Sequence, residues 1–118
     1  LEEVWGHSFD WVWDRLGAHL EIPGYLNVYV AYVDGLPASA AWIYFHAGSQ
    51  IASLWGGSTR QAYRQQGLYS ALLAARAQSA RRSGVRFLTV DASPMSAPIL
   101  AKHGFFQIAT AWACEVKI

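Results

Sequence analysis

Residues 63–70, Tyr-Arg-Gln-Gln-Gly-Leu-Tyr-Ser, run directly into an alanine- and leucine-rich stretch at residues 71–77. Gly67 indicates a loop, and the residues that follow it favour a helix. The first N–H groups of a helix have no partner inside the helix, and the positive end of the helix dipole lies beside them. The stretch therefore predicts an anion-binding site at the start of a helix.

This stretch resembles the pyrophosphate-binding loop of the GNAT N-acyltransferase superfamily, Arg/Gln-x-x-Gly-x-Gly/Ala. Arg64 and Gly67 match that pattern, whereas Tyr69 stands where the family usually has Gly or Ala. The resemblance extends over residues 25–118 and includes four further segments in the family's order: 26–46, 51–59, 85–90 and 102–105. It implies a fold of the α/β class (α+β, with a mixed central sheet) in the three-layer GNAT-like arrangement.

Length and composition fit one domain. The chain has 118 residues, of which 53% are hydrophobic and 14% charged, which indicates a buried core or a face hidden against a partner. We divide it into an N-terminal helix and lead-in, residues 1–24, and a GNAT-like acyltransferase domain, residues 25–118. The family usually begins with a strand and a helix that residues 1–24 cannot hold. We therefore expect a fragment, a homo-oligomer, or an additional N-terminal domain that covers this edge.

Several partners are excluded by the composition. No apolar run approaches the roughly 18 residues of a membrane helix and no signal peptide opens the chain, so we expect no membrane and a cytoplasmic location. A net charge of +1 argues against nucleic acid, and the basic residues of the 68–86 region predict a solvated face: Arg76, Arg81, Arg82 and Arg86. One cysteine and four scattered histidines predict no metal site.

The N-terminal half predicts a helix and three strands. Apolar spacing indicates a helix within residues 4–20, with Ser8 as N-cap and a stop at residues 22–24. Residues 26–33 and 37–46 alternate and flank an Asp-Gly turn, which predicts an antiparallel hairpin. Within it, Trp42, Tyr44 and His46 share one face and Ile43 and Phe45 the other.

The strand predicted at residues 51–59 contains adjacent glycines, Gly56 and Gly57, which mark a bulge or a close backbone approach. The resemblance implies that this strand splays from the next one and that the pantetheine arm of coenzyme A lies in the gap. A bulge that only bends the sheet is the alternative.

The C-terminal half predicts a helix over residues 68–83 capped by Gly84, then a parallel strand at 85–90. A short helix follows at 97–103, with Ser96 as N-cap and Pro98 in its first turn. The remaining residues, 105–108 and 112–118, are expected to form a terminal hairpin.

The resemblance implies an N-acetyltransferase (more broadly, an N-acyltransferase) that uses acetyl-CoA as co-substrate, without a metal, and acylates a small-molecule or peptide amine. The residues implied in cofactor binding are Gly57, Ser58, Thr59, Arg64, Gln65, Gln66, Gly67, Leu68, Tyr69 and Ser70. For Arg64 a solvated surface position is the alternative. A second hypothesis is a GNAT-like domain that binds acyl-CoA, or a neighbouring domain, without turnover.

Catalysis requires a neutral amine, a polarised carbonyl and a proton for the thiolate. The strand at 51–59 has no carboxylate, which leaves Asp91 and His46 as candidate bases; a turn or capping role is the alternative for Asp91. The resemblance implies a tyrosine acid on or beside Leu100, and leucine cannot donate a proton. Ser93 and Ser96 are the nearby hydroxyls, and Tyr69 is the nearest aromatic one. Tyr69 is therefore the candidate acid, with packing beside Leu68 and Leu72 as its alternative.

Overall fold

The computed structural model describes residues 10–64, 66–94 and 96–111. In chain order its elements are α2 (Asp10–Leu20), β1 (Leu26–Val33), β2 (Leu36–Phe45), β3 (Ile51–Thr59), the 3-10 helix η1 (Gln61–Tyr63), α3 (Leu68–Arg82), β4 (Phe87–Val90) and α4 (Ala97–Lys102). The four strands form one sheet in the order β1-β2-β3-β4. The first three are antiparallel, and β4 is parallel to β3. The expected mixed-sheet α+β fold is confirmed.

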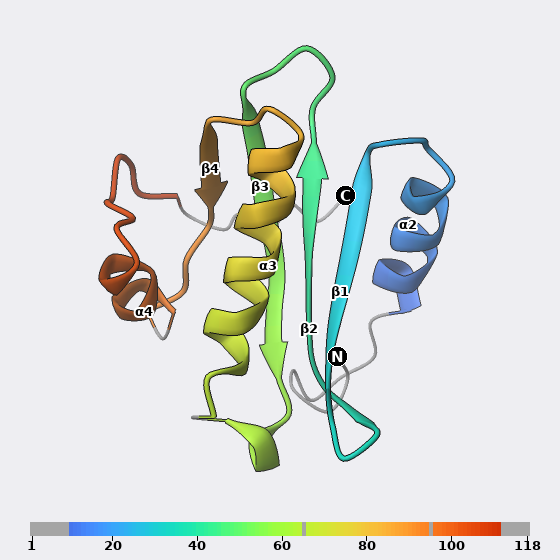
Figure 1. The fold of residues 1–118 in the computed structure, drawn as a ribbon, viewed down its shortest axis with the longest axis vertical. Helices are drawn as coiled ribbons and strands as arrows, with labels where there is room; N and C mark the ends of the chain where they lie inside the picture. The colour runs from blue at the N-terminus through green and yellow to red at the C-terminus, as the bar shows by residue number, and fades with distance from the viewer. Residues whose placement is uncertain (1–9, 65, 95, 112–118) are drawn as a thin grey trace, which may run out of the picture.

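Helices α3 and α2 pack on opposite faces of this sheet. Ile43 of β2 and Leu54 of β3 form a buried cluster with Leu73 of α3. The neighbouring residue of β2, Trp42, belongs to a second cluster with Leu16 of α2. Because successive side chains of a strand point to opposite faces, the two clusters lie on the two sides of the sheet. The expected three layers follow, with α3 running along the sheet in Figure 1.

Backbone hydrogen bonds define how α3 ends. Ser83 is the C-cap and Gly84, at φ +81°, is the next residue. The N–H of Val85 donates to the Ala80 carbonyl and the N–H of Gly84 to that of Arg81, which is the Schellman arrangement. The prediction of Gly84 as the cap was therefore one residue late, although its left-handed conformation explains why glycine stands there.

The start of α4 is as predicted, whereas the first strand of the expected terminal hairpin is not. Ser96 is the N-cap, and a proline lies in the first turn. Residues 105–111 carry no regular secondary structure, so the predicted strand at 105–108 is wrong; Phe106 is 84% exposed. A strand needs a ladder partner, and residues 112–118, the predicted partner, lie outside the described ranges. The predicted N-cap Ser8 also lies outside them.

On the α2 side, His19, Tyr25 and Tyr44 form an aromatic cluster. The His19 Nδ1 atom and the Tyr44 hydroxyl share a hydrogen bond of 2.7 Å, and the Tyr25 ring lies 5.0 Å from the Tyr44 ring. Burial raises the pKa of the Tyr44 phenol above its ordinary value of 10.0; Tyr25 adds to the increase and Arg15 opposes it.

This shift predicts an alkaline dependence of stability. A phenol with a raised pKa in the folded state contributes stability that is complete below pH 10.0 and is lost as the pH rises through the folded-state pKa. Tyr44→Phe removes the titrating group. In urea unfolding series from neutral to strongly alkaline pH, the free energy of unfolding should therefore fall less steeply for the variant than for the wild type. Equal alkaline slopes would contradict the prediction.

Candidate functional site

The glycine pair of β3 forms a bulge against β2. Ala40 pairs with Ser58 and Trp42 with Trp55, so that Gly56 and Gly57 together oppose one residue, Ala41. Gly56 has φ +83°, and a Cβ atom added to it would lie 2.3 Å from Cζ3 of Trp42. The predicted bulge is confirmed, and the indole side chain of Trp42 occupies the space that a side chain at Gly56 would need.

The β3–β4 ladder ends just before this bulge, because β4 ends at Val90. The ladder joins residues 51–54 of β3 to residues 87–90 of β4. Beyond Leu54, β3 continues to Thr59, and no strand within the described ranges pairs with that part on the β4 side. An extended ligand can hydrogen-bond to such a strand edge in the way an added strand would. Gly57, Ser58 and Thr59 lie on this edge.

The predicted anion-binding loop connects the end of β3 to the start of α3. Gly67 is the N-cap at φ +79°, no side chain caps the helix, and the Gly67 carbonyl accepts the first helical bond from Ala71. Nε of Arg64 donates to the Thr59 carbonyl at 3.1 Å, which ties the loop to the strand. Gln66 is exposed beside them, and Gln65 lies outside the described ranges.

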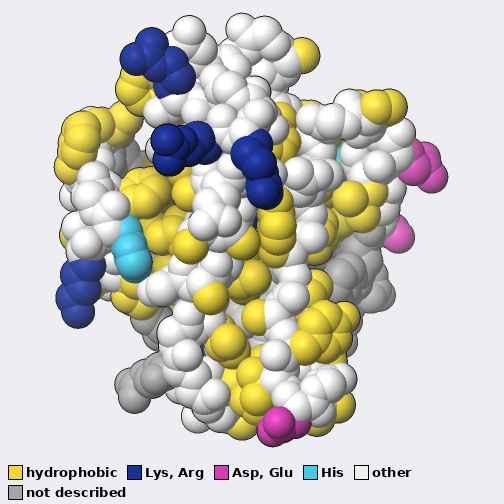
Figure 2. Space-filling view, in the orientation of Figure 1, with side chains coloured by type: hydrophobic (Ala, Val, Ile, Leu, Met, Phe, Trp, Pro, Cys, Tyr) yellow, Lys and Arg dark blue, Asp and Glu magenta, His cyan; other side chains and the backbone are white. Residues whose placement is uncertain are grey.

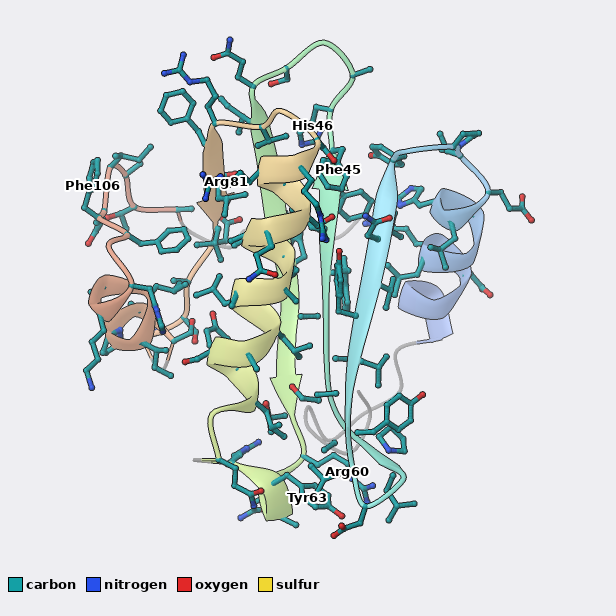
Figure 3. The ribbon with its side chains drawn as sticks, in the orientation of Figure 1. Phe45, His46, Arg60, Tyr63, Arg81 and Phe106 are labelled. Atoms are coloured by element: carbon teal, nitrogen blue, oxygen red, sulfur yellow. The ribbon has the colours of Figure 1, made fainter. Side chains whose placement is uncertain are left out.

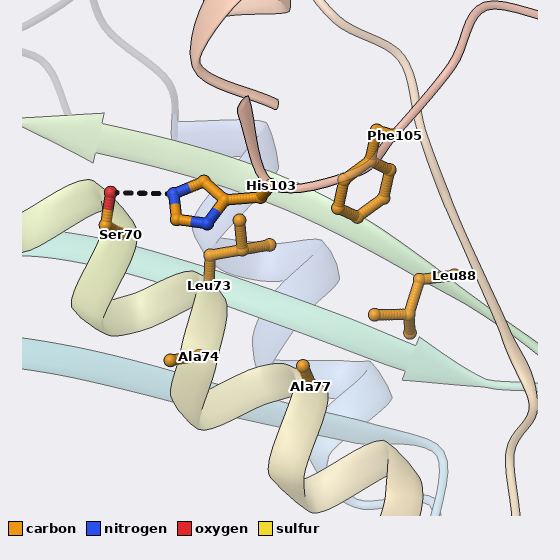
Figure 4. Close-up of a pocket in the computed structure, with 7 residues that line it drawn as sticks. All are labelled: Ser70, Leu73, Ala74, Ala77, Leu88, His103 and Phe105. Carbon is orange, nitrogen blue, oxygen red and sulfur yellow. Dashed lines mark hydrogen bonds between the residues drawn. The ribbon is translucent and has the colours of Figure 1, made fainter. Parts of the chain in front are cut away.

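The first turn of α3 places Tyr69 and Ser70 differently. Tyr69 is half-buried and packs on the cluster around Ile43 and Leu54. The hydroxyl of Ser70 lies 3.1 Å from Nε2 of His103, the C-cap of α4. This bond closes one end of a pocket of about 180 Å³, shown in Figure 4. The lining residues are Ser70, Leu73, Ala74, Ala77, Leu88, His103 and Phe105.

The two candidate bases lie at opposite ends of the β3–β4 ladder, because β2 ends beside the start of β3 and Asp91 follows the end of β4. Asp91 is exposed and directly follows β4, where the two strands separate. The start of α4 is held by Ser93 and Ser96, since each backbone N–H donates to the other's hydroxyl. His46, labelled in Figure 3, follows β2, and its Nε2 lies 2.9 Å from the Ser53 hydroxyl.

One basic residue departs from the predicted solvated face. Arg81, Arg82 and Arg86 are exposed, and Figure 2 shows basic side chains gathered over the C-terminal end of α3. Arg76 is only 2% exposed, so its assignment to that face is wrong. Burial lowers the pKa of its guanidinium, and the nearby phenols of Tyr69 and Tyr29 act in the opposite direction.

The described residues match the features of neither a metal site nor a membrane-spanning helix. No three or more His, Cys, Asp or Glu side chains gather there in a way that could hold a metal ion. Within the same ranges, no helix combines the length and the apolar character needed to cross a bilayer.

A mixed sheet that splits beside an uncapped helix start defines an α+β domain of the acetyltransferase type. A sequence profile of the acetyltransferase (GNAT) domain matches residues 4–92. The chain belongs to this family. No curated protein matches it significantly.

Solved structures share the fold at low sequence identity. AAC(6')-Iy in complex with the bisubstrate analogue CoA-S-monomethyl-acetylneamine gives a TM-score of 0.78 at 21% identity, covering 99% of this chain and 86% of that one. The aminoglycoside 6'-N-acetyltransferase AAC(6')-IG from Acinetobacter haemolyticus gives 0.75 at 18%, with 97% and 85% covered. Glucosamine-6-phosphate N-acetyltransferase from Arabidopsis thaliana gives 0.77 at 12%, with 95% and 82% covered.

Proposed function

We propose that this chain transfers an acetyl or other acyl group from acyl-CoA to the amine of a small molecule or peptide. The observation that carries the proposal is the β3 edge that continues unpaired past the end of β4, next to the glycine bulge and to an α3 start that no described side chain caps. The two features suit the two parts of coenzyme A. A strand edge can hold its amide-bearing pantetheine arm, and a helix start can hold its pyrophosphate.

Within this proposal the pyrophosphate meets the backbone N–H groups of residues 66–70, with Arg64 adding positive charge. Each hydrogen bond to a charged group contributes about 1.5–3 kcal/mol, so a few of them account for binding without a lysine. The edge formed by residues 57–59 takes the pantetheine arm. The Ser70–His103 pocket lies against the same helix turn and gives apolar surface beside the loop.

The reaction needs two proton movements. The acceptor nitrogen forms a bond to the thioester carbonyl carbon, the carbon–sulfur bond breaks, the nitrogen loses a proton and the thiolate gains one. Asp91, exposed at the point where β3 and β4 separate, is the proposed base, acting through water. Tyr69 is the proposed acid, because it places a phenol, which can donate a proton, in the first turn of α3.

Titration calorimetry with acetyl-CoA tests the binding, and release of the coenzyme A thiol tests turnover. Aminoglycosides and amino-sugar phosphates form the first acceptor panel, because two proteins of the same fold are named as acetyltransferases of such compounds.

One observation favours the second candidate function, a domain that binds acyl-CoA without turnover. The resemblance implies the family's tyrosine acid on or beside Leu100, which is a leucine 3% exposed in the core. Binding with no turnover across the panel would support that alternative.

For the acid role, we expect Tyr69→Phe to lower turnover by about a hundredfold while acetyl-CoA affinity stays unchanged, because only the hydroxyl is removed. The control is Tyr63→Phe in η1, which removes a phenol from the other end of the loop and should leave turnover unaltered. Unchanged turnover in Tyr69→Phe would leave Tyr69 as a packing residue.

A further inference from the structure

Arg76 reaches from the middle of α3 to the backbone of the bulged strands. Its Nε donates to the Leu72 carbonyl of the same helix at 3.2 Å. Its Nη1 donates to two carbonyls in the sheet, those of Trp42 on β2 and Trp55 on β3, each at 3.3 Å. The guanidinium therefore connects three backbone segments that are far apart in the sequence.

The two sheet carbonyls flank the bulge. Trp42 and Trp55 are the register pair at which the ladder shifts, and Gly56 is the next residue of β3. A bulge disrupts the ladder locally and leaves backbone groups in need of other partners. Arg76 supplies donors from the α3 side. The Trp42 indole fills the space over Gly56 on the opposite side, so the bulge is held from both faces.

Burying a guanidinium at a core position costs more free energy than burying an apolar side chain there. Removing a cation from water carries a large desolvation cost, and an apolar side chain of similar volume is often at least as stabilising. The three partners of Arg76 are carbonyl dipoles, which recover part of that cost through hydrogen bonds to a charged donor. The guanidinium also places a positive charge beneath the β2–β3 bulge. Filling the core requires neither these hydrogen bonds nor the positive charge.

We propose that Arg76 is a positioning residue of the acyl-CoA site: by holding the Trp42 and Trp55 carbonyls it fixes the Gly56–Gly57 bulge and the direction of the β3 edge beyond it. This inference rests on the proposed function. It adds a side chain from outside the loop and the strand edge, one that acts on the ligand through the backbone of β3 and not by touching it.

The test compares acetyl-CoA affinity in folded variants, measured by titration calorimetry well below the unfolding midpoint of each protein. Arg76→Met keeps the aliphatic stem and deletes the donors, and should weaken binding at least tenfold. Arg76→Lys keeps a cation that can reach some of the carbonyls and should fall between Met and the wild type. Ser79→Ala is the matched control. Ser79 is buried on the same helix and accepts a bond from Asn27, so its loss should lower stability without changing affinity.

The outcomes separate this inference from the proposed function. If the wild type does not bind acetyl-CoA, the proposed function itself fails. If the wild type binds and Arg76→Met binds equally well, or if Ser79→Ala weakens binding as much as Arg76→Met does, the positioning role is overturned. Should Arg76→Met fail to fold, Arg76→Lys decides, since one ammonium cannot reproduce the three-carbonyl contact. A loss of threefold or more then supports the role, and wild-type affinity overturns it.

Discussion

Gly67→Val should weaken acetyl-CoA binding by about a hundredfold or more, to the limit of detection, and leave the protein folded. Gly67 has φ +79° at the N-cap of α3, a conformation in which a β-branched residue is a genuine outlier. The loop must rotate to relieve the strain, and the N–H groups that follow it lose their common direction. Losing two hydrogen bonds to phosphate at about 1.5 kcal/mol or more each gives the expected factor.

The other end of α3 provides a matched control for this experiment. Gly84 has φ +81°, and, as at Gly67, a Cβ atom added there would meet nothing within 4 Å. Gly84→Val therefore introduces the same backbone strain at a place far from the predicted pyrophosphate. Titration calorimetry should show near wild-type affinity for Gly84→Val and none for Gly67→Val. Unchanged affinity in Gly67→Val would show that the loop is not the binding site.

Gly56→Ala should lower the free energy of unfolding by about 2–5 kcal/mol. Its Cβ atom would overlap the Trp42 ring, whose three nearest atoms lie at 2.3–2.6 Å, and overpacking of this kind costs about 1–3 kcal/mol. The left-handed backbone, at φ +83°, adds about 1–2 kcal/mol for any residue with a Cβ atom. Since small domains are stable by only about 5–15 kcal/mol, the loss should be large in urea unfolding.

Gly48→Ala separates the two contributions. Gly48 lies in the turn between β2 and β3 at φ +73°, and a Cβ atom there would meet nothing within 4 Å. This control should lose only the backbone contribution of about 1–2 kcal/mol. Equal losses in the two variants would mean that Trp42 moves aside at little cost and that the bulge does not depend on the close approach.

The sequence was sufficient for features that arise locally. Alternation along β2 predicted that Trp42 and Ile43 face opposite sides, and two adjacent glycines predicted the bulge. Ser96 with a following proline defined the start of α4. Each of these rests on neighbouring residues and on one periodicity, and the structure confirms them.

Features that depend on distant contacts were missed. Arg76 lies four residues after the buried Leu72 and four before the buried Ala80, so its helical position indicated the core. Its charge was given more weight than its position, because arginine is seldom fully buried. The Ser70–His103 bond joins residues 33 apart and had no local signal. The predicted strand at 105–108 depended on a partner outside the described ranges.

The helix start of α3 and the free edge of β3 present main-chain groups, and main-chain groups are the same whichever side chains surround them. Most positions of the loop and the strand can therefore accept other side chains, provided that the glycines with left-handed backbone remain. Solved structures share this fold at TM-scores of 0.78 and 0.77 with identities of only 21% and 12%, so the fold itself tolerates extensive substitution. Exposed side chains away from the loop and the strand edge, such as Gln78 on α3, are accordingly the places where a designer can change charge or attach a probe while the backbone surface keeps its shape.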